Sequence, residues 1–226
     1  MSIEGRRGIL TCGHVAEMYG ALPEIGLVRF AGDTQSQRRI IRLGDTQTII
    51  AQSSDSFEEN KEVIDLAFTM LPPDIASSIE AQGVFLNIEK NRTKMESWAS
   101  TKEKHIDGVL ALVEEFSKAP FKEGKEFISP MRGVLHTGNV SARENGLLTL
   151  KAMDYNRPQL PERFGGMSGG GLWRIYFTED EKGAEITGTM LCGVVSWQMD
   201  ETQLACQGWD RIDQGLIPAV RKNLAF

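Results

Sequence analysis

Short apolar segments, each closed by turn residues, follow one another along most of the chain, and this pattern limits its fold more than any other feature. Glycine, proline, asparagine or aspartate lies near most of the segment ends. We expect these segments to be strands: 8–12, 25–30, 39–43, 46–51, 63–70, 132–140, 146–152, 171–177 and 187–197. Two of the dipeptides between them, Gly44-Asp45 and Asn145-Gly146, have the turn chemistry of a hairpin.

Helical patterning is confined to a few places. Residues 104–117 have the clearest helical period, because apolar residues recur at steps of three and four with charges opposite. A short helix is also expected at 74–82, after a pair of prolines. Another is expected at 216–224, where Pro218 suits a first turn.

Two strand-rich halves joined by a segment with one good helix predict an all-β protein of two small antiparallel barrels. We expect an N-terminal barrel at 1–90, a partly helical insertion at 91–130, and a C-terminal barrel with a short terminal helix at 131–226. The insertion is expected to cover a cleft, to dock a partner, or to be a structural helix packed on the surface.

Charge and cysteine content narrow the choice of partner and compartment. The formal net charge is −6, and no basic block offsets it, so neither nucleic acid nor an anionic membrane surface is an expected partner. No apolar run reaches the roughly 20 residues that span a bilayer, and no secretory signal is recognisable. The chain has 3 cysteines, which indicates a reducing cytoplasm. A Cys192–Cys206 bridge and buried reduced thiols both remain open.

A candidate nucleophile lies in the glycine-rich segment 165–171. Ser168 is its one serine, and glycines on both sides permit a tight turn whose N–H groups converge beside the hydroxyl. That is the geometry of an oxyanion hole. A flexible glycine loop is the alternative.

A serine needs a base, and the base needs an acid. His14 directly follows the strand at 8–12, whereas His105 and His136 suit ordinary surface or strand positions. Asp65 stands in an apolar strand, where a buried carboxylate without a partner is costly. A hydrogen bond to His14 would remove that cost. The alternatives are a half-buried structural histidine and an edge-strand aspartate that faces water.

Four motifs, in this order, resemble those of the chymotrypsin-like serine peptidases. They are Leu10-Thr11-Cys12-Gly13-His14, Ile64-Asp65-Leu66-Ala67, Gly166-Met167-Ser168-Gly169-Gly170 and Val194-Val195-Ser196-Trp197. The resemblance covers about residues 8 to 212 and implies a trypsin-like serine endopeptidase that acts on protein or peptide substrates. The bacterial, intracellular branches of the family are the nearer comparison.

The resemblance also implies a role for each residue. Ser168 would be the nucleophile, His14 the base, and Asp65 the group that orients it. The N–H groups of Gly166 and Ser168 would form the oxyanion hole. Further residues would bind substrate: Ser196, Trp197, Gln198 and Glu162. No metal or organic cofactor is needed.

Two departures from the family pattern point to regulation. Met167 occupies a position where many relatives carry an aspartate that pairs with a newly cut N-terminus, so activation by such cleavage is not expected. The histidine motif also begins close to Met1, so the first barrel is expected to be incomplete unless another segment or a partner supplies a strand. Both features suggest control by a partner protein or an assembly.

Two other functions fit the same motifs. A catalytically silent peptide-binding module would keep the fold and hold a peptide without cutting it. An esterase would use the same three side chains on small esters.

Overall fold

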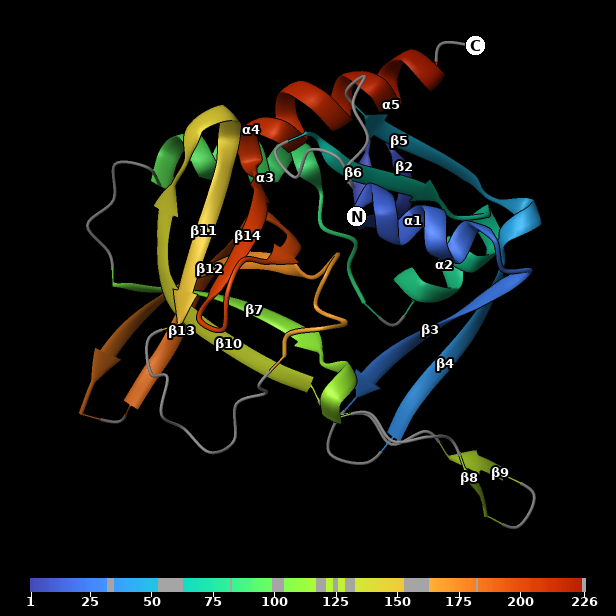
Figure 1. Ribbon diagram of the computed structural model, residues 1–226, viewed down its shortest axis with the longest axis horizontal. Coiled ribbons are helices and arrows are strands. Elements are labelled where there is room, and N and C mark those ends of the chain that lie inside the picture. The colour runs from blue at the N-terminus through green and yellow to red at the C-terminus, as the bar shows by residue number, and fades with distance from the viewer. Residues whose placement is uncertain are drawn as a thin grey trace. The chain divides into compact units, whose positions relative to one another are not determined.

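The computed structural model describes residues 1–31, 35–52, 63–81, 83–98, 104–116, 121–123, 126–128, 133–152, 163–181 and 183–224. The chain divides into two compact units (Figure 1). The first unit contains Met1–Arg92 together with Gln214–Phe226, and the second contains Thr93–Asp213. The C-terminal segment therefore belongs with the N-terminal unit, whereas the sequence placed it with the second half.

The first unit is built on a four-stranded antiparallel sheet with the order β1-β2-β6-β5. Its strands are β1 (Ser2–Ile3), β2 (Arg6–Thr11), β5 (Gln47–Gln52) and β6 (Asp65–Met70). A separate ribbon pairs β3 (Glu24–Ala31) with β4 (Gln35–Arg42). Within the described residues these strands form open sheets, so the expectation of an N-terminal barrel is wrong.

The hairpin expected around Gly44-Asp45 is also wrong. The dipeptide lies in a single 3-10 turn, η1 (Leu43–Asp45), where both the N–H and the hydroxyl of Thr46 donate to the carbonyl of Leu43. The chain changes direction there without pairing its flanking strands. Instead, β4 pairs with β3, and β5 pairs with β6.

Helices make a large part of the first unit, so the all-β prediction is corrected. They are α1 (Gly13–Gly20), α2 (Pro73–Glu80), α5 (Ile217–Leu224) and the first part of α3 (Ile88–Trp98), which crosses the boundary between the units after Arg92. The expected short helices near 74–82 and 216–224 are confirmed as α2 and α5. By contrast, α1 was not predicted. It packs Ala16 and Tyr19 against Ala67 of β6.

The second unit is a ring of six antiparallel strands with the order β10-β11-β14-β13-β12-β7, closed between β7 and β10. Its strands are β7 (His105–Leu112), β10 (Gly133–Ala142), β11 (Leu147–Ala152), β12 (Gly171–Asp180), β13 (Gly183–Gln198) and β14 (Gln203–Gly208). The turn predicted at Asn145-Gly146 is confirmed. Both residues have positive φ, 57° and 72°, and they join β10 to β11.

The helix predicted at 104–117 is a strand in the structure. β7 pairs with β10 on one side and with β12 on the other, so both edges of its backbone are hydrogen-bonded. Val109 is fully buried, whereas Leu110 is 65% exposed, which is the alternation of a strand. Gly108 approaches the backbone of β10 so closely that a Cβ there would lie 3.2 Å from the carbonyl oxygen of His136. Tertiary pairing thus overrides the apparent helical period.

Short elements complete the second unit. They are η2 (Glu114–Phe116), β8 (Phe121–Glu123) paired with β9 (Glu126–Ile128), η3 (Glu144–Gly146), α4 (Trp209–Arg211) and the π-helical turn η4 (Ile212–Leu216), which runs across the boundary of the units. The segment 91–130, expected to be an insertion, thus contributes β7 to the ring. No helix among the described residues is long and apolar enough to cross a membrane.

Candidate active site

His14 and Asp65 form a hydrogen-bonded pair in the first unit. Antiparallel pairing of β2 with β6 sets Thr11 opposite Ala67, so the chain that leaves β2 passes the beginning of β6. Nδ1 of His14 lies 2.7 Å from Oδ2 of Asp65, and the backbone N–H of His14 donates to Oδ1 at 2.9 Å. The predicted contact between the two residues is confirmed.

Burial fixes the roles of the two side chains. The Asp65 side chain is 2% exposed and that of His14 is 32% exposed. A carboxylate so deeply buried needs strong donors, and both of its oxygens receive one from His14. When Nδ1 carries the donated hydrogen, the neutral imidazole has its lone pair on Nε2. The pair is therefore arranged as a base whose tautomer is set by a buried acid.

Gly13 makes this close approach possible. A Cβ at this position would lie 2.9 Å from Oδ1 of Asp65 and 3.2 Å from Cγ2 of Ile50. The first of these distances is too short for a real side chain, so any larger residue would displace the carboxylate. Glycine between Cys12 and His14 is thus a steric requirement of the His14–Asp65 pair.

Ser168 lies in the second unit, in a tight turn that leads into β12. Gly166 and Gly169 have φ values of +86° and +85°, which L side chains rarely adopt. The turn is fixed to β13, because Gly169 N–H donates to the carbonyl of Val195 and Val195 N–H donates to the carbonyl of Gly170, both at 2.8 Å. It is fixed on its other side by the N–H of Glu114, which donates to Gly165 at 2.9 Å. The flexible-loop alternative does not fit a turn tied at so many points.

Two N–H groups of this turn remain for a ligand. Among the described residues, neither the N–H of Gly166 nor that of Ser168 donates a hydrogen bond within the protein. These are the two donors that the sequence assigned to an oxyanion hole. Amide donors that are positioned before the reaction are the main requirement for stabilising an oxyanion.

The Ser168 hydroxyl donates to the carbonyl oxygen of Ser196 at 2.9 Å. Ser196 is the extra residue of a β-bulge, since Val195 pairs with Cys206 and Trp197 pairs with Ala205. A bulged residue is left out of the ladder between the two strands. The bulge therefore places a main-chain acceptor beside the candidate nucleophile.

Met167 anchors the turn by burial. It is fully buried and belongs to the core of the ring together with Phe164 and Leu172. The side chain of Met167 thus holds the turn to the core of the ring by apolar packing. Behind it, the ring of His136 lies 4.7 Å from that of Phe164 in an edge-on arrangement. His136 is buried, and its Nε2 has no hydrogen-bond partner among the described residues.

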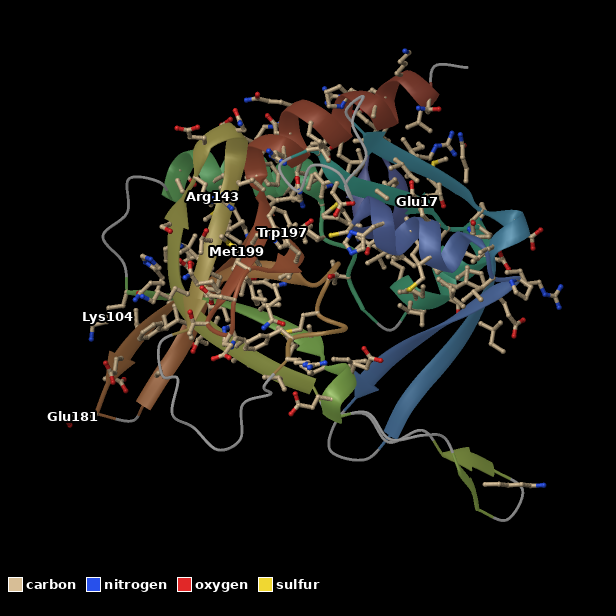
Figure 2. The ribbon with its side chains drawn as sticks, in the orientation of Figure 1. Glu17, Lys104, Arg143, Glu181, Trp197 and Met199 are labelled. Carbon is tan, nitrogen blue, oxygen red and sulfur yellow. The ribbon has the colours of Figure 1, made fainter. Side chains whose placement is uncertain are left out.

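The residues expected to bind substrate lie on β13 or beyond the described residues. Trp197, labelled in Figure 2, is half-buried near the carboxyl end of β13. Gln198 accepts a hydrogen bond from the N–H of Phe164 at 3.0 Å and donates to the carbonyl of Asp200. It thus links the strand to the segment before the serine. Glu162 lies outside the described residues.

The cysteines are free thiols, and all of them are buried. Burial raises the pKa of Cys192 to about 11 and that of Cys206 to about 12. A bridge between these two residues, one of two possibilities left open by the sequence, is not present. Cys12 is different because its sulfur, a ring nitrogen of His14 and a carboxylate oxygen of Asp65 lie within 4.8 Å of one another. Within the part of the chain that the structure describes, this is the group of side chains that could hold a metal ion.

Sequence reasoning missed two contributions to this site. The Glu114 N–H that fixes Gly165 was missed because its segment was expected to be helical, and Cys12 was not singled out as a possible metal ligand. The spacing of Cys12 and His14 beside a buried aspartate was the available signal for the second. The described contacts join His14 to Asp65 in one unit, and Ser168 to Ser196 in the other.

A comparison of the sequence with protein-family models gives no match, and neither does a search of curated proteins. Any function assigned to the chain therefore rests on its own residues.

Proposed function

We propose that the protein is a serine endopeptidase that cleaves peptide bonds through Ser168, His14 and Asp65. The observation that carries the proposal is the buried bond of 2.7 Å between Asp65 and Nδ1 of His14. A buried aspartate that fixes the tautomer of a half-exposed histidine is the arrangement of a general base.

The proposed reaction has two stages. The Ser168 oxygen attacks the carbonyl carbon of the substrate while Nε2 of His14 takes the hydroxyl proton. The C–N bond then breaks as the same proton passes to the leaving amine, and an acyl-serine remains. Water, deprotonated by Nε2, attacks this ester, and the proton returns to Ser168 as the acid product leaves.

Stabilisation of charge is assigned to fixed groups. The N–H groups of Gly166 and Ser168 would hold the oxyanion, and each such donor is worth about 3 kcal/mol in hydrolases of this type. Asp65 would stabilise the imidazolium that forms during each proton transfer. Both contributions need groups that are held in place before the reaction. The pinned turn and the buried carboxylate support the proposal for that reason.

Binding of the substrate backbone is assigned to the strand end at Ser196. An extended peptide that donates a main-chain N–H to the carbonyl of Ser196 would lie beside Trp197. Free, buried thiols suit a reducing compartment, so we include an intracellular location in the proposal. A peptidase in that setting needs control, which we assign to a partner protein or an assembly.

The direct test is covalent labelling of the full chain by a fluorophosphonate probe. We expect one label on Ser168, loss of the label in Ser168→Ala, and an unchanged label in Ser141→Ala, which removes an exposed serine of β10. Circular dichroism would confirm that each variant is folded. No label on the folded wild-type chain, with or without candidate partner proteins, would overturn the proposal.

Labelling alone does not separate a peptidase from an esterase. Incubation with a peptide library, followed by mass spectrometry, should give new peptide termini with the wild type and none with Ser168→Ala. Turnover of small esters without any new termini would instead identify an esterase. A chain that binds peptides and takes no label would be a silent binding module.

A further inference from the structure

Three side chains with metal-binding atoms meet where β2 ends and β6 begins. Cys12 is the residue before α1, His14 lies in the first turn of α1, and Asp65 is the first residue of β6. Their sulfur, nitrogen and oxygen atoms lie within 4.8 Å of one another. Cys12 is fully buried and Asp65 nearly so, whereas His14 is about one-third exposed. An ion could therefore reach the group from the side of His14.

The chemistry of these three ligands favours zinc. A thiolate, an imidazole and a carboxylate are the ligand types that Zn²⁺ takes in proteins, and three protein ligands with one water are the usual set of an open zinc site. The two anionic ligands together balance the charge of the ion, which matters in a buried setting. Cys12 also lies at the N-terminal end of α1, where the helix dipole stabilises a negative sulfur.

The geometry needs only small adjustments. In a tetrahedral site with ordinary bond lengths, ligand atoms lie about 3.4 to 3.6 Å apart. Nδ1 of His14 and Oδ2 of Asp65 are 2.7 Å apart as a hydrogen-bonded pair, so they would separate slightly to admit the ion. The second carboxylate oxygen accepts the N–H of His14, and such a bond holds a ligating carboxylate in position.

We propose that Cys12, His14 and Asp65 form a zinc site that switches the proposed peptidase off. Zinc would bind Nδ1 in place of the hydrogen that Asp65 now accepts. The thiol of Cys12 and Nδ1 of His14 would each release a proton to solvent, and Nε2 would take up one proton, so that the imidazole stays neutral with its hydrogen on Nε2. Because Nε2 then lacks a lone pair, His14 cannot take the proton of Ser168. The inhibitory effect rests on the proposed function, whereas the metal site does not.

The metal site is tested on Ser168→Ala, so that peptidase activity plays no part. Titration with Co²⁺, which replaces Zn²⁺ in such sites, should produce a sulfur-to-cobalt charge-transfer band, and Zn²⁺ should remove it. Calorimetry should give one Zn²⁺ per chain. Adding Cys12→Ser should abolish the band and weaken zinc binding by at least about tenfold. Cys192→Ser, which removes a buried thiol of β13, should change neither.

Two results would overturn the metal site. One is the absence of a sulfur-to-cobalt band in the folded protein, and the other is a band of equal strength after Cys12→Ser. His14→Ala provides a second variant at a half-exposed position, and it should weaken zinc binding as well. Near-UV circular dichroism would show that both variants keep their packing.

The switch is tested on the chain with Ser168 intact. Fluorophosphonate labelling should slow as Zn²⁺ is added and recover with a chelator, and Cys12→Ser should be less sensitive to zinc when compared with its own rate in chelator. Labelling that continues unchanged while zinc is bound would overturn the switch. If zinc binds but no form of the protein is ever labelled, the switch falls together with the proposed function and the metal site stands.

Discussion

The hydroxyl of Ser168 donates to the main-chain carbonyl of Ser196 at 2.9 Å, across a β-bulge. Without a bound substrate, the hydroxyl hydrogen of Ser168 is therefore already donated to a main-chain acceptor. A serine that is to lose its proton to an imidazole must exchange one acceptor for another, so release from Ser196 is a step of the proposed reaction. A peptide N–H that binds the same carbonyl would compete for it.

This competition predicts a specific effect of N-methylation. A peptidyl phosphonate should label Ser168 faster than its analogue methylated at the amide next to the phosphonate. One hydrogen bond of about 1 to 1.5 kcal/mol corresponds to about a tenfold slower reaction. Methylation of an amide further along the peptide is the control. Equal rates for all three reagents would show that Ser196 does not receive the substrate.

Asp65→Asn should leave the fold intact and remove most of the activity. The amide would still fill the buried position, but its NH₂ group would favour the wrong tautomer of His14. A loss of about 10⁴-fold in kcat is expected for this substitution in a Ser-His-Asp site. Asp74→Asn, in the exposed first turn of α2, is the control and should be neutral. Peptide cleavage and thermal unfolding would be measured together. If Asp65→Asn kept its activity, Asp65 would have no part in the chemistry.

Gly166→Ala should damage the oxyanion hole more than the fold. The residue has a φ of +86°, and a Cβ there would lie 3.1 Å from the nitrogen of Glu114 and the oxygen of Leu112. We expect a loss of stability of about 1 to 2 kcal/mol from the backbone conformation. Alanine keeps the main-chain N–H, but the strained turn should shift and aim this donor away from the oxyanion, which should slow the labelling of Ser168 by up to about 10² to 10³-fold.

Gly183→Ala separates these two effects. Gly183 also has a positive φ, +130°, but apart from its chain neighbours no atom of the described residues lies within 4 Å of a Cβ added there. It should therefore cost stability without affecting labelling. The assignment of the oxyanion hole would be contradicted if both alanine variants labelled at the wild-type rate.

The burial of His136 lets us predict how the free energy of unfolding depends on pH. Its burial lowers its pKa below the usual value of about 6.5. As the pH falls through 6.5, the unfolded chain takes up a proton that the folded chain does not, so the free energy of unfolding should fall until the lower folded pKa is reached. His136→Leu should weaken this dependence, whereas His105→Asn, at an exposed position, should leave it unchanged. Urea unfolding between pH 7.5 and pH 5 is the measurement. If His136→Leu had the same pH dependence of unfolding as the wild type, His136 would not be its cause.

Local patterns predicted the strands better than they predicted which strands pair. The Asn145-Gly146 turn was predictable because both of its residues adopt positive φ readily. Gly44-Asp45 has similar chemistry, yet its flanking strands, β4 and β5, pair with β3 and β6 and not with each other. Turn residues tell where a chain can reverse, but the partner of a strand depends on contacts that are distant in sequence.

The helix expected at 104–117 failed for a related reason. Apolar residues at steps of three and four fit a helix in isolation, but both edges of β7 are occupied by other strands. Pairing with β10 and β12 lies outside any local window. The mixture of helices and strands in the first unit was missed in the same way, since α1 has too short an apolar pattern to be recognised.

The His14–Asp65 contact could be predicted because the cost of a buried carboxylate demands a partner. The hydrogen bond from Ser168 to the carbonyl of Ser196 could not be predicted, because every residue has a main-chain oxygen and the residue type does not indicate which one is used. The position of Cys12 was visible in the sequence, but its distance from Asp65 depends on how β2 and β6 align. A partner that burial demands is thus predictable from sequence, whereas main-chain contacts and the alignment of strands are not.

The return of the last segment to the first unit has a consequence for synthesis. α5 contacts β5, Gly215 lies against Ile64, and Arg221 pairs with Glu4 at 2.6 Å. A ribosome makes Glu4 and β5 long before it makes Arg221 and α5. The nascent N-terminal unit must therefore wait, with the face that receives α5 uncovered, until the whole ring has been translated. Chaperone capture during that interval is a natural expectation for this chain.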